Sequence, residues 1–140
     1  MSSLDTFKTC TALKVGSDTV TDFLSGTDKL AFSQAGLKVG DGDVVVEGAV
    51  VRAAAGGFAS SAELVIFSSN VASLTATSAA AAIGSATSAM ATGKTALFAV
   101  DNGAASALYL FTSADGNAAV SAGELALLAT LGSTPATAVS

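Results

Sequence analysis

The part of the chain best suited to chemistry is an oxygen-rich stretch at residues 113–124. Its polar side chains fall at positions 1, 3, 5, 9 and 12 of a loop of EF-hand length: Ser113, Asp115, Asn117, Ser121 and Glu124. This spacing can direct oxygens at one hard cation, and a final glutamate can bind calcium through both oxygens. Serine at position 1 and alanine at position 6 depart from the usual loop. Because only two of the five side chains carry charge, the spacing predicts a weak calcium site.

The same stretch also fits an interpretation that needs no metal. Ser121 and Glu124 form the S-x-x-E pattern of a capping box, in which serine and glutamate each satisfy a backbone N–H at the start of a helix. On the residues alone, the calcium loop and the capped helix start both remain open.

A second group of carboxylates lies near the N-terminus. It comprises Asp18, Asp22 and Asp28, with Asp41 and Asp43 further along the chain. Such carboxylates could bind calcium at the end of a β-roll. Aspartate is also common in turns for reasons of backbone hydrogen bonding. Judged without further context, the turn interpretation is favoured over the metal site.

The chain lacks the side chains that usually activate a nucleophile. It has no histidine, which removes the usual general base and the commonest zinc ligand. Its single cysteine, Cys10, has no basic neighbour close enough to favour a thiolate. The abundant serines have no base to activate them. We therefore expect that the protein is not an enzyme.

Residues 91–95, with the sequence ATGKT, are similar to the end of a phosphate-binding P-loop. That motif requires a strand before it and a helix after it, so that the helix N-terminus faces the phosphate. Here the preceding segment is alanine-rich and favours a helix, while the following segment favours a strand. We predict that Lys94 is a surface charge at the start of a strand.

Most of the elements that would position these residues are predicted to be strands. Apolar runs at residues 96–100 and 107–111 flank Asp101-Asn102-Gly103, a turn sequence that accepts positive φ, and so predict a β-hairpin. Residues 63–67, ELVIF, are the strongest candidate for a central strand. Further strands are predicted at residues 11–15, 18–24, 29–32 and at 44–47 with 49–52, where Gly48 between the two runs indicates a bulge or bend, which gives about seven in all.

Two segments are predicted to be helical. Residues 73–90 are rich in alanine, and Gly84 is expected to interrupt or end that helix. In residues 120–131, Leu125, Leu128 and Leu131 recur at helical spacing. The predicted fold is mainly β, a β-sandwich or short β-roll with both helices packed against it. Residues 1–131 would form one domain and residues 132–140 a flexible C-terminal tail.

Composition limits the possible partners. The chain has 140 residues, 51% hydrophobic and 12% charged, and a net charge of −5. The acidic net charge argues against nucleic acid as a partner, and no uninterrupted apolar stretch is long enough to span a membrane. Few charges and many small residues are typical of an extracellular β protein. The N-terminus lacks a classical secretory signal, so we expect an export signal at the C-terminus.

Two segments resemble a known family. Residues 18–30, DTVTDFLSGTDKL, are similar to the D-x-I-x-D-F-x-x-G-x-D-K-I/L segment that follows the calcium-binding repeats of RTX proteins. Residues 95–131 resemble the C-terminal ends of secreted bacterial proteins of that group, including surface-layer-like proteins. The resemblance implies type I secretion through an uncleaved C-terminal signal, and calcium-promoted folding outside the cell. The nonapeptide repeats are absent and Ala31 replaces an expected aspartate, so the family's calcium ladder is not carried over.

Together these features predict an extracellular, non-enzymatic structural protein that associates with itself at the cell surface or in an extracellular layer or fibre. Low charge and strand edges without lysine favour such association. One alternative is an adhesive or carbohydrate-binding module, for which the aromatic residues would have to be exposed. Another is a passive C-terminal export domain of a larger RTX protein.

Overall fold

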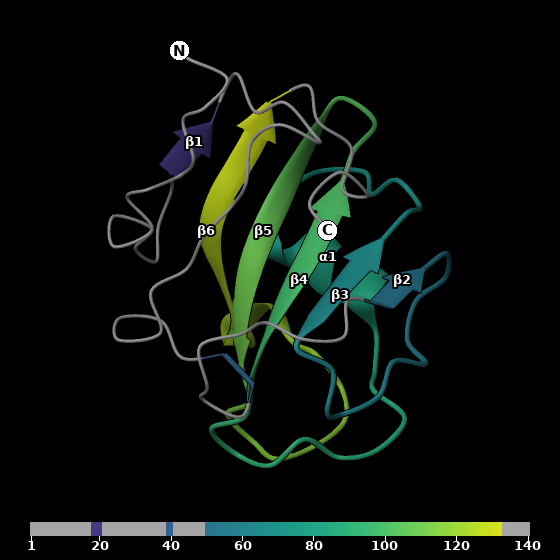
Figure 1. Cartoon of the computed structure of the whole chain (residues 1–140), viewed down its shortest axis with the longest axis vertical. Coiled ribbons are helices and arrows are strands. Elements are labelled where there is room, and N and C mark those ends of the chain that lie inside the picture. Colours follow the sequence, from purple (N-terminus) through teal and green to yellow (C-terminus); the bar gives the residue numbers. More distant parts are fainter. Residues whose placement is uncertain (1–17, 21–38, 41–49, 133–140) are drawn as a thin grey trace.

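The computed structural model describes residues 18–20, 39–40 and 50–132 (Figure 1). Its strands belong to one six-stranded sheet with the order β1-β6-β5-β4-β3-β2. The bounds of the strands are β1 Asp18–Val20, β2 Val50–Arg52, β3 Leu64–Phe67, β4 Thr95–Asp101, β5 Ala105–Thr112 and β6 Leu125–Gly132. The fold is therefore mainly β, as predicted.

The sheet is mixed. Strand β5 is antiparallel to its neighbours β4 and β6, whereas β1 is parallel to β6, and β2 and β3 are parallel to each other and to β4. Five strands consequently run in one direction, and β5 alone runs in the other. Both edge strands, β1 and β2, share the majority direction.

The predicted hairpin is confirmed by β4 and β5, which pair antiparallel from Thr95↔Thr112 to Asp101↔Ser106. Gly103 has φ +90° in the connecting turn, a conformation that glycine adopts without steric cost. The central strand predicted at residues 63–67 is also confirmed, because β3 lies between β2 and β4. Its side chains Val65, Ile66 and Phe67 are buried on both faces of the sheet.

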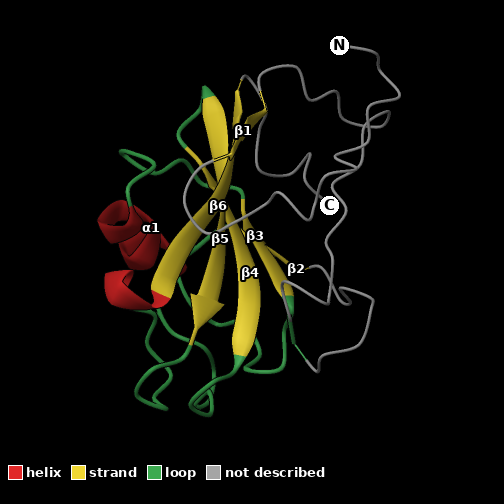
Figure 2. Ribbon diagram, turned by 90° about the vertical axis from the view of Figure 1, so that its left-hand side faces the viewer, coloured by secondary structure: helices red, strands yellow, loops and turns green. Residues whose placement is uncertain are grey.

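The alanine-rich segment forms helix α1, Ala76–Ile83, which covers one face of the sheet (Figure 2). Thr75 caps its start by accepting a hydrogen bond from the backbone N–H of Ser78 at 3.3 Å, which satisfies one of the free donors of the first turn. Gly84, with φ +73°, ends the helix. The predicted interruption at Gly84 is confirmed, and the helix does not continue toward residue 90.

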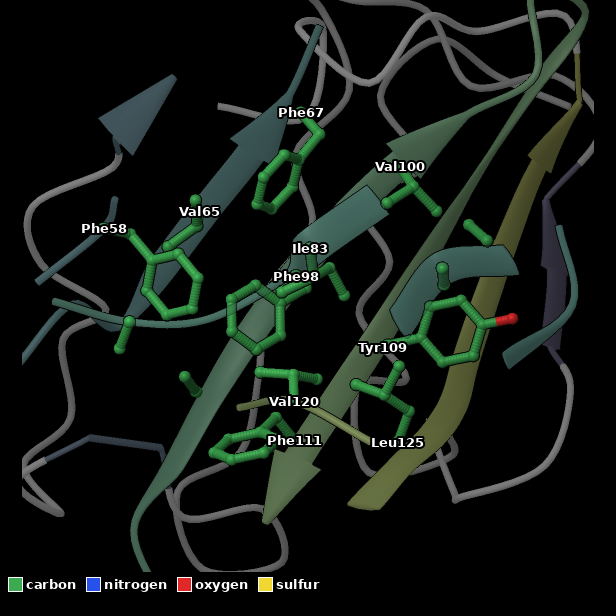
Figure 3. Close-up of a cluster of buried hydrophobic side chains, with 14 of the residues drawn as sticks. Phe58, Val65, Phe67, Ile83, Phe98, Val100, Tyr109, Phe111, Val120 and Leu125 are labelled. Carbon is green, nitrogen blue, oxygen red and sulfur yellow. The ribbon is translucent and has the colours of Figure 1, made fainter. Parts of the chain in front are cut away.

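The main core lies between α1 and the sheet and is built around phenylalanine rings (Figure 3). The ring of Phe98, on β4, meets Phe58 edge to face at a centroid distance of 5.3 Å and meets Phe111 at 5.7 Å. Each such pair adds about 0.5–1.5 kcal/mol beyond the burial of apolar surface. Ile83, from α1, is also fully buried in this cluster. Ala79, also from α1, is fully buried in the same cluster.

The opposite face of the sheet carries a second buried cluster. Its members on the strands are Ile66, Leu97, Ala99, Leu108 and Leu128. Val39, from a separate segment, packs on this face with no exposed surface. The next residue, Gly40, donates its backbone N–H to the Thr95 carbonyl at 3.2 Å and to the Thr95 hydroxyl at 3.1 Å. Residues 39–40 are thereby fixed to the start of β4.

The predicted C-terminal helix at residues 120–131 is wrong. A single 3₁₀ turn, η2 (Ala122–Glu124), is followed at once by strand β6. The register between β5 and β6 shifts at Leu108/Tyr109, so that Leu128 is an extra residue on β6. Leu125 lies in the core under α1 and Leu128 in the cluster on the opposite face, because strand residues three apart point to opposite faces. The three-residue spacing of Leu125 and Leu128 is therefore compatible with a strand that buries both of its faces.

The number and layering of strands also differ from the prediction. Within residues 18–20, 39–40 and 50–132, the strands form one open sheet, and neither a second sheet nor a roll is present there. Strands predicted at residues 11–15, 29–32 and 44–47 lie outside the described residues, as do most of the segment 18–24 and residues 133–140 of the predicted tail. The count of about seven strands is not confirmed.

Candidate functional site

The oxygen-rich loop joins β5 to β6 at the end of the sheet opposite the β4–β5 turn (Figure 1). Ser113, its first residue, is only 2% exposed. The Ser113 hydroxyl donates to the Met90 carbonyl at 3.0 Å and accepts from the backbone N–H of Gly116 at 3.3 Å. This serine therefore connects the loop to the segment that precedes β4.

Asp115 and Asn117 hold each other on the exposed side of the loop. The two oxygens of the Asp115 carboxylate accept from the backbone N–H and the side-chain amide of Asn117, at 3.1 and 2.6 Å. The Asn117 side-chain oxygen accepts from the backbone N–H of Ala119 at 2.7 Å. These are local turn contacts of the kind that favour aspartate and asparagine in loops.

Glu124 closes the loop and is largely buried, with 7% of its surface exposed. Its Oε1 accepts from the Ala114 N–H at 2.8 Å, and its Oε2 accepts from the Ser121 N–H at 3.0 Å and the Ser121 hydroxyl at 2.9 Å. Burial raises the pKa of the Glu124 carboxyl, but these hydrogen bonds together outweigh it and hold the pKa below its ordinary value.

The loop thus has the contacts of the capping interpretation. The Ser121–Glu124 capping box is present at the start of η2. The side-chain oxygens of all five predicted residues take part in hydrogen bonds within the protein. In the part of the chain that the structure describes, no three acidic, histidine or cysteine side chains gather as metal ligands. The loop keeps its shape through its own N–H and O–H donors.

The N-terminal carboxylates are placed only in part. Asp18 begins β1, where it lies opposite Ala129 of β6. Asp22, Asp28, Asp41 and Asp43 lie outside the described residues. The structure therefore brings together the residues of the loop, and of the second predicted group the described residues include Asp18.

Aromatic side chains do not form a binding platform in the described residues. Tyr109 is 2% exposed, and its hydroxyl donates to the Leu74 carbonyl. Burial raises the pKa of the Tyr109 hydroxyl above its usual value. The phenylalanines within residues 50–132 are buried as well: Phe58, Phe67, Phe98 and Phe111. These side chains stabilise the core and are not available to stack on a sugar.

Sequence reasoning missed two features. The first is the outer edge of the sheet at β2, where Val51 is 56% exposed and Val50 is 37% exposed. The second is the hydrogen-bonded turn at residues 101–105, which was predicted only as a hairpin connection. The dipeptide Asn102-Gly103 was a sequence signal that could have indicated the hydrogen-bonded turn. The exposure of β2 has no such signal, because it depends on the place of β2 at the end of the sheet order.

Comparisons of the chain with protein-family models, with curated proteins and with solved structures gave no match. Neither described helix has the length and apolar character required to cross a bilayer.

Proposed function

We propose that this protein is an extracellular, non-enzymatic structural protein that associates with further copies of itself through the edge of its sheet at β2. The observation that carries the proposal is the exposure of Val50 and Val51 on that strand. Neighbouring residues of a strand point to opposite faces, so both faces of the sheet are uncovered at this edge. Exposed apolar strand edges favour pairing with a strand from another molecule.

The charges near β2 support the same proposal. Proteins commonly protect an edge strand with lysine or an inward-pointing charge, and the charged residue on β2 is Arg52. Its side-chain Nε donates to the Gly56 carbonyl at 2.9 Å, which holds the guanidinium along its own chain. With 12% charged residues in the whole sequence, electrostatic repulsion between copies is small.

Export by a type I secretion system and stabilisation by calcium also belong to the proposal. They rest on the resemblance of residues 18–30 and 95–131 to RTX proteins. The extracellular location follows from that resemblance and from the low content of charge. The carbohydrate-binding alternative is ranked lower because the described aromatic side chains are buried.

Self-association is tested by placing a charge on the edge. We expect the wild-type chain to form larger species with rising concentration in light scattering and electron microscopy. Val51→Lys should shift it toward the monomer, because a strand pair would have to bring lysine beside a like charge or bury it. Val51 is exposed, so the free energy of unfolding should change by less than about 0.5 kcal/mol.

The matched control is Ala81→Lys, which adds the same charge on an exposed position of α1 and should leave association intact. A wild-type chain that stays monomeric at high concentration would refute the proposal, as would association unaffected by Val51→Lys. Secretion of a fused cargo by a chain that remains monomeric would instead support the export-domain alternative.

A further inference from the structure

The turn between β4 and β5 contains a base, a nucleophile and an amide electrophile, the three groups needed for attack on a side-chain amide. Asp101 ends β4, Asn102 and Gly103 form the turn, and Ala105 begins β5. The turn lies at the upper end of the sheet in Figure 1. Its hydrogen bonds place a base, a nucleophile and a polarised amide next to one another.

The nucleophile and its base are Gly103 and Asp101. The backbone N–H of Gly103 donates to Asp101 Oδ1 at 3.0 Å, within the reach expected of a general base. Asp101 is 5% exposed, so bulk water has little access to this direct hydrogen bond. Gly103 has no side chain to shield its nitrogen.

The electrophile is the side-chain amide of Asn102. Its Oδ1 accepts two backbone hydrogen bonds, from the Ala104 N–H at 3.0 Å and the Ala105 N–H at 2.9 Å. Two N–H groups that donate to one amide oxygen polarise its carbonyl, and donors of this kind stabilise negative charge that develops on the oxygen. Asn102 itself is exposed, so ammonia can leave and water can enter.

We propose that Asn102-Gly103 is a self-modifying site, at which the folded turn promotes deamidation of Asn102. Asp101 takes the proton from the Gly103 nitrogen, whose electron pair forms a bond to Cγ of Asn102. The carbonyl electrons move onto Oδ1, where the Ala104 and Ala105 N–H groups hold the negative charge. As the carbonyl re-forms, the bond from Cγ to Nδ2 breaks, and Nδ2 leaves as ammonia with the proton returned by Asp101.

The product of that step is a five-membered succinimide, which water then opens. Attack on the side-chain carbonyl gives aspartate, and attack on the backbone carbonyl gives isoaspartate. In total one water is consumed, one ammonia is released and Asp101 is regenerated. The net charge of the chain changes from −5 to −6, since one neutral amide becomes one carboxylate. Isoaspartate also adds a backbone atom to the turn that sets the β4–β5 register.

The other two asparagines of the chain provide an internal comparison. Asn70 precedes Val71 and Asn117 precedes Ala118, so each is followed by a residue with a side chain. The Nδ2 of Asn117, which would be the leaving group, donates to Asp115 at 2.6 Å. We therefore expect Asn102 to react much faster than Asn70 or Asn117.

The test measures deamidation of each asparagine by peptide mapping of the full chain, incubated folded in buffer and unfolded in guanidinium chloride at the same pH. We expect deamidation of Asn102 to be at least about tenfold faster in the folded chain than in the unfolded chain. This threshold is set below the hundredfold or more that a positioned general base supplies. A turn that only holds Asn102 in place would instead slow the reaction on folding. A folded rate equal to or below the unfolded rate overturns the proposal.

The variant Asp101→Asn keeps an oxygen for the Gly103 N–H but removes the base. In the folded variant we expect the deamidation rate of Asn102 to fall to about the rate of the unfolded chain. In the unfolded variant the rate should equal that of the unfolded wild-type chain. An unchanged folded rate would overturn the role of Asp101. If the variant does not fold, the comparison of folded and unfolded wild-type chain decides the proposal alone.

Discussion

Glu124 shows how one buried carboxylate can be held by hydrogen-bond donors of its own loop. Its carboxylate is taken out of water by burial, which disfavours the charge, and is stabilised by donors from Ala114 and Ser121, which favour it. The net lowering of the Glu124 pKa indicates that the hydrogen bonds dominate. The ionised form is therefore the one that stabilises the fold.

We expect Glu124→Gln to destabilise the protein by about 1.5–3 kcal/mol at pH 7, the range for hydrogen bonds to a charged group. The folded-state pKa lies below the unfolded value of 4.5. The contribution of Glu124 is thus fully present above about pH 4.5 and is lost as the pH falls through the folded-state pKa. Denaturant unfolding of both chains at pH 7 and pH 3 should show the difference shrinking at low pH.

Asp115→Asn is the matched control in the same loop. Asp115 is exposed, so loss of its charge should change the free energy of unfolding by less than about 0.5 kcal/mol. If Asp115→Asn were as harmful as Glu124→Gln, the capping explanation would be incorrect.

At the scale of elements, the end of α1 depends on a glycine for two separate reasons. Gly84 has φ +73°, and a Cβ added there would lie 2.9 Å from the Gly56 nitrogen and 3.3 Å from the Ala55 Cβ. A side chain would therefore meet both backbone strain and a contact with the segment that follows β2. Gly93, with φ +88°, has open space around the same position.

Comparison of Gly84→Ala with Gly93→Ala separates these effects. We expect Gly93→Ala to cost about 1–2 kcal/mol through its left-handed backbone alone. Gly84→Ala should cost more, because the segment at residues 55–56 must also shift. Thermal unfolding of the two variants measures the difference, and equal losses would show that the contact at Gly84 relaxes without cost.

Some elements could be predicted because their local preference agrees with their place in the sheet. Strands β3, β4 and β5 each carry β-branched or aromatic residues, and Asp101-Asn102-Gly103 specifies the hairpin turn between β4 and β5. Strand β6 has leucines and alanines, which favour helix locally, and its pairing with β5 on one side and β1 on the other decides otherwise. Such long-range pairing is not encoded in any short window of sequence.

The candidate loop was predictable in the same limited way. The spacing of Ser121 and Glu124 was enough to predict the capping box, because that interaction spans four residues. The hydrogen bond of Glu124 to Ala114 and that of Ser113 to Met90 connect distant positions. Only the fold brings those partners together, so spacing alone could not choose between a cap and a cation site.

For the whole molecule, the proposed role of calcium is measured by its effect on stability. A ligand that binds the folded chain alone adds about 2.7 kcal/mol at a hundred times its dissociation constant. We expect the melting temperature to rise with calcium up to millimolar concentrations. The variants Asp22→Asn and Glu124→Gln show which oxygen-rich segment is responsible, because the calcium-dependent rise in melting temperature should be lost in the variant that removes a ligand. A flat melting temperature over that range would remove calcium from the proposal.

The direction of the strands has a consequence for any larger assembly. Since β1 and β2 run the same way at opposite edges, copies related by simple translation would meet in parallel, and the resulting filament would have two unlike ends. Copies related by a twofold axis beside β2 would instead pair β2 with β2, and association through that edge would end at a dimer. Growth from a single end, followed under the microscope, would therefore reveal which geometry the chain adopts.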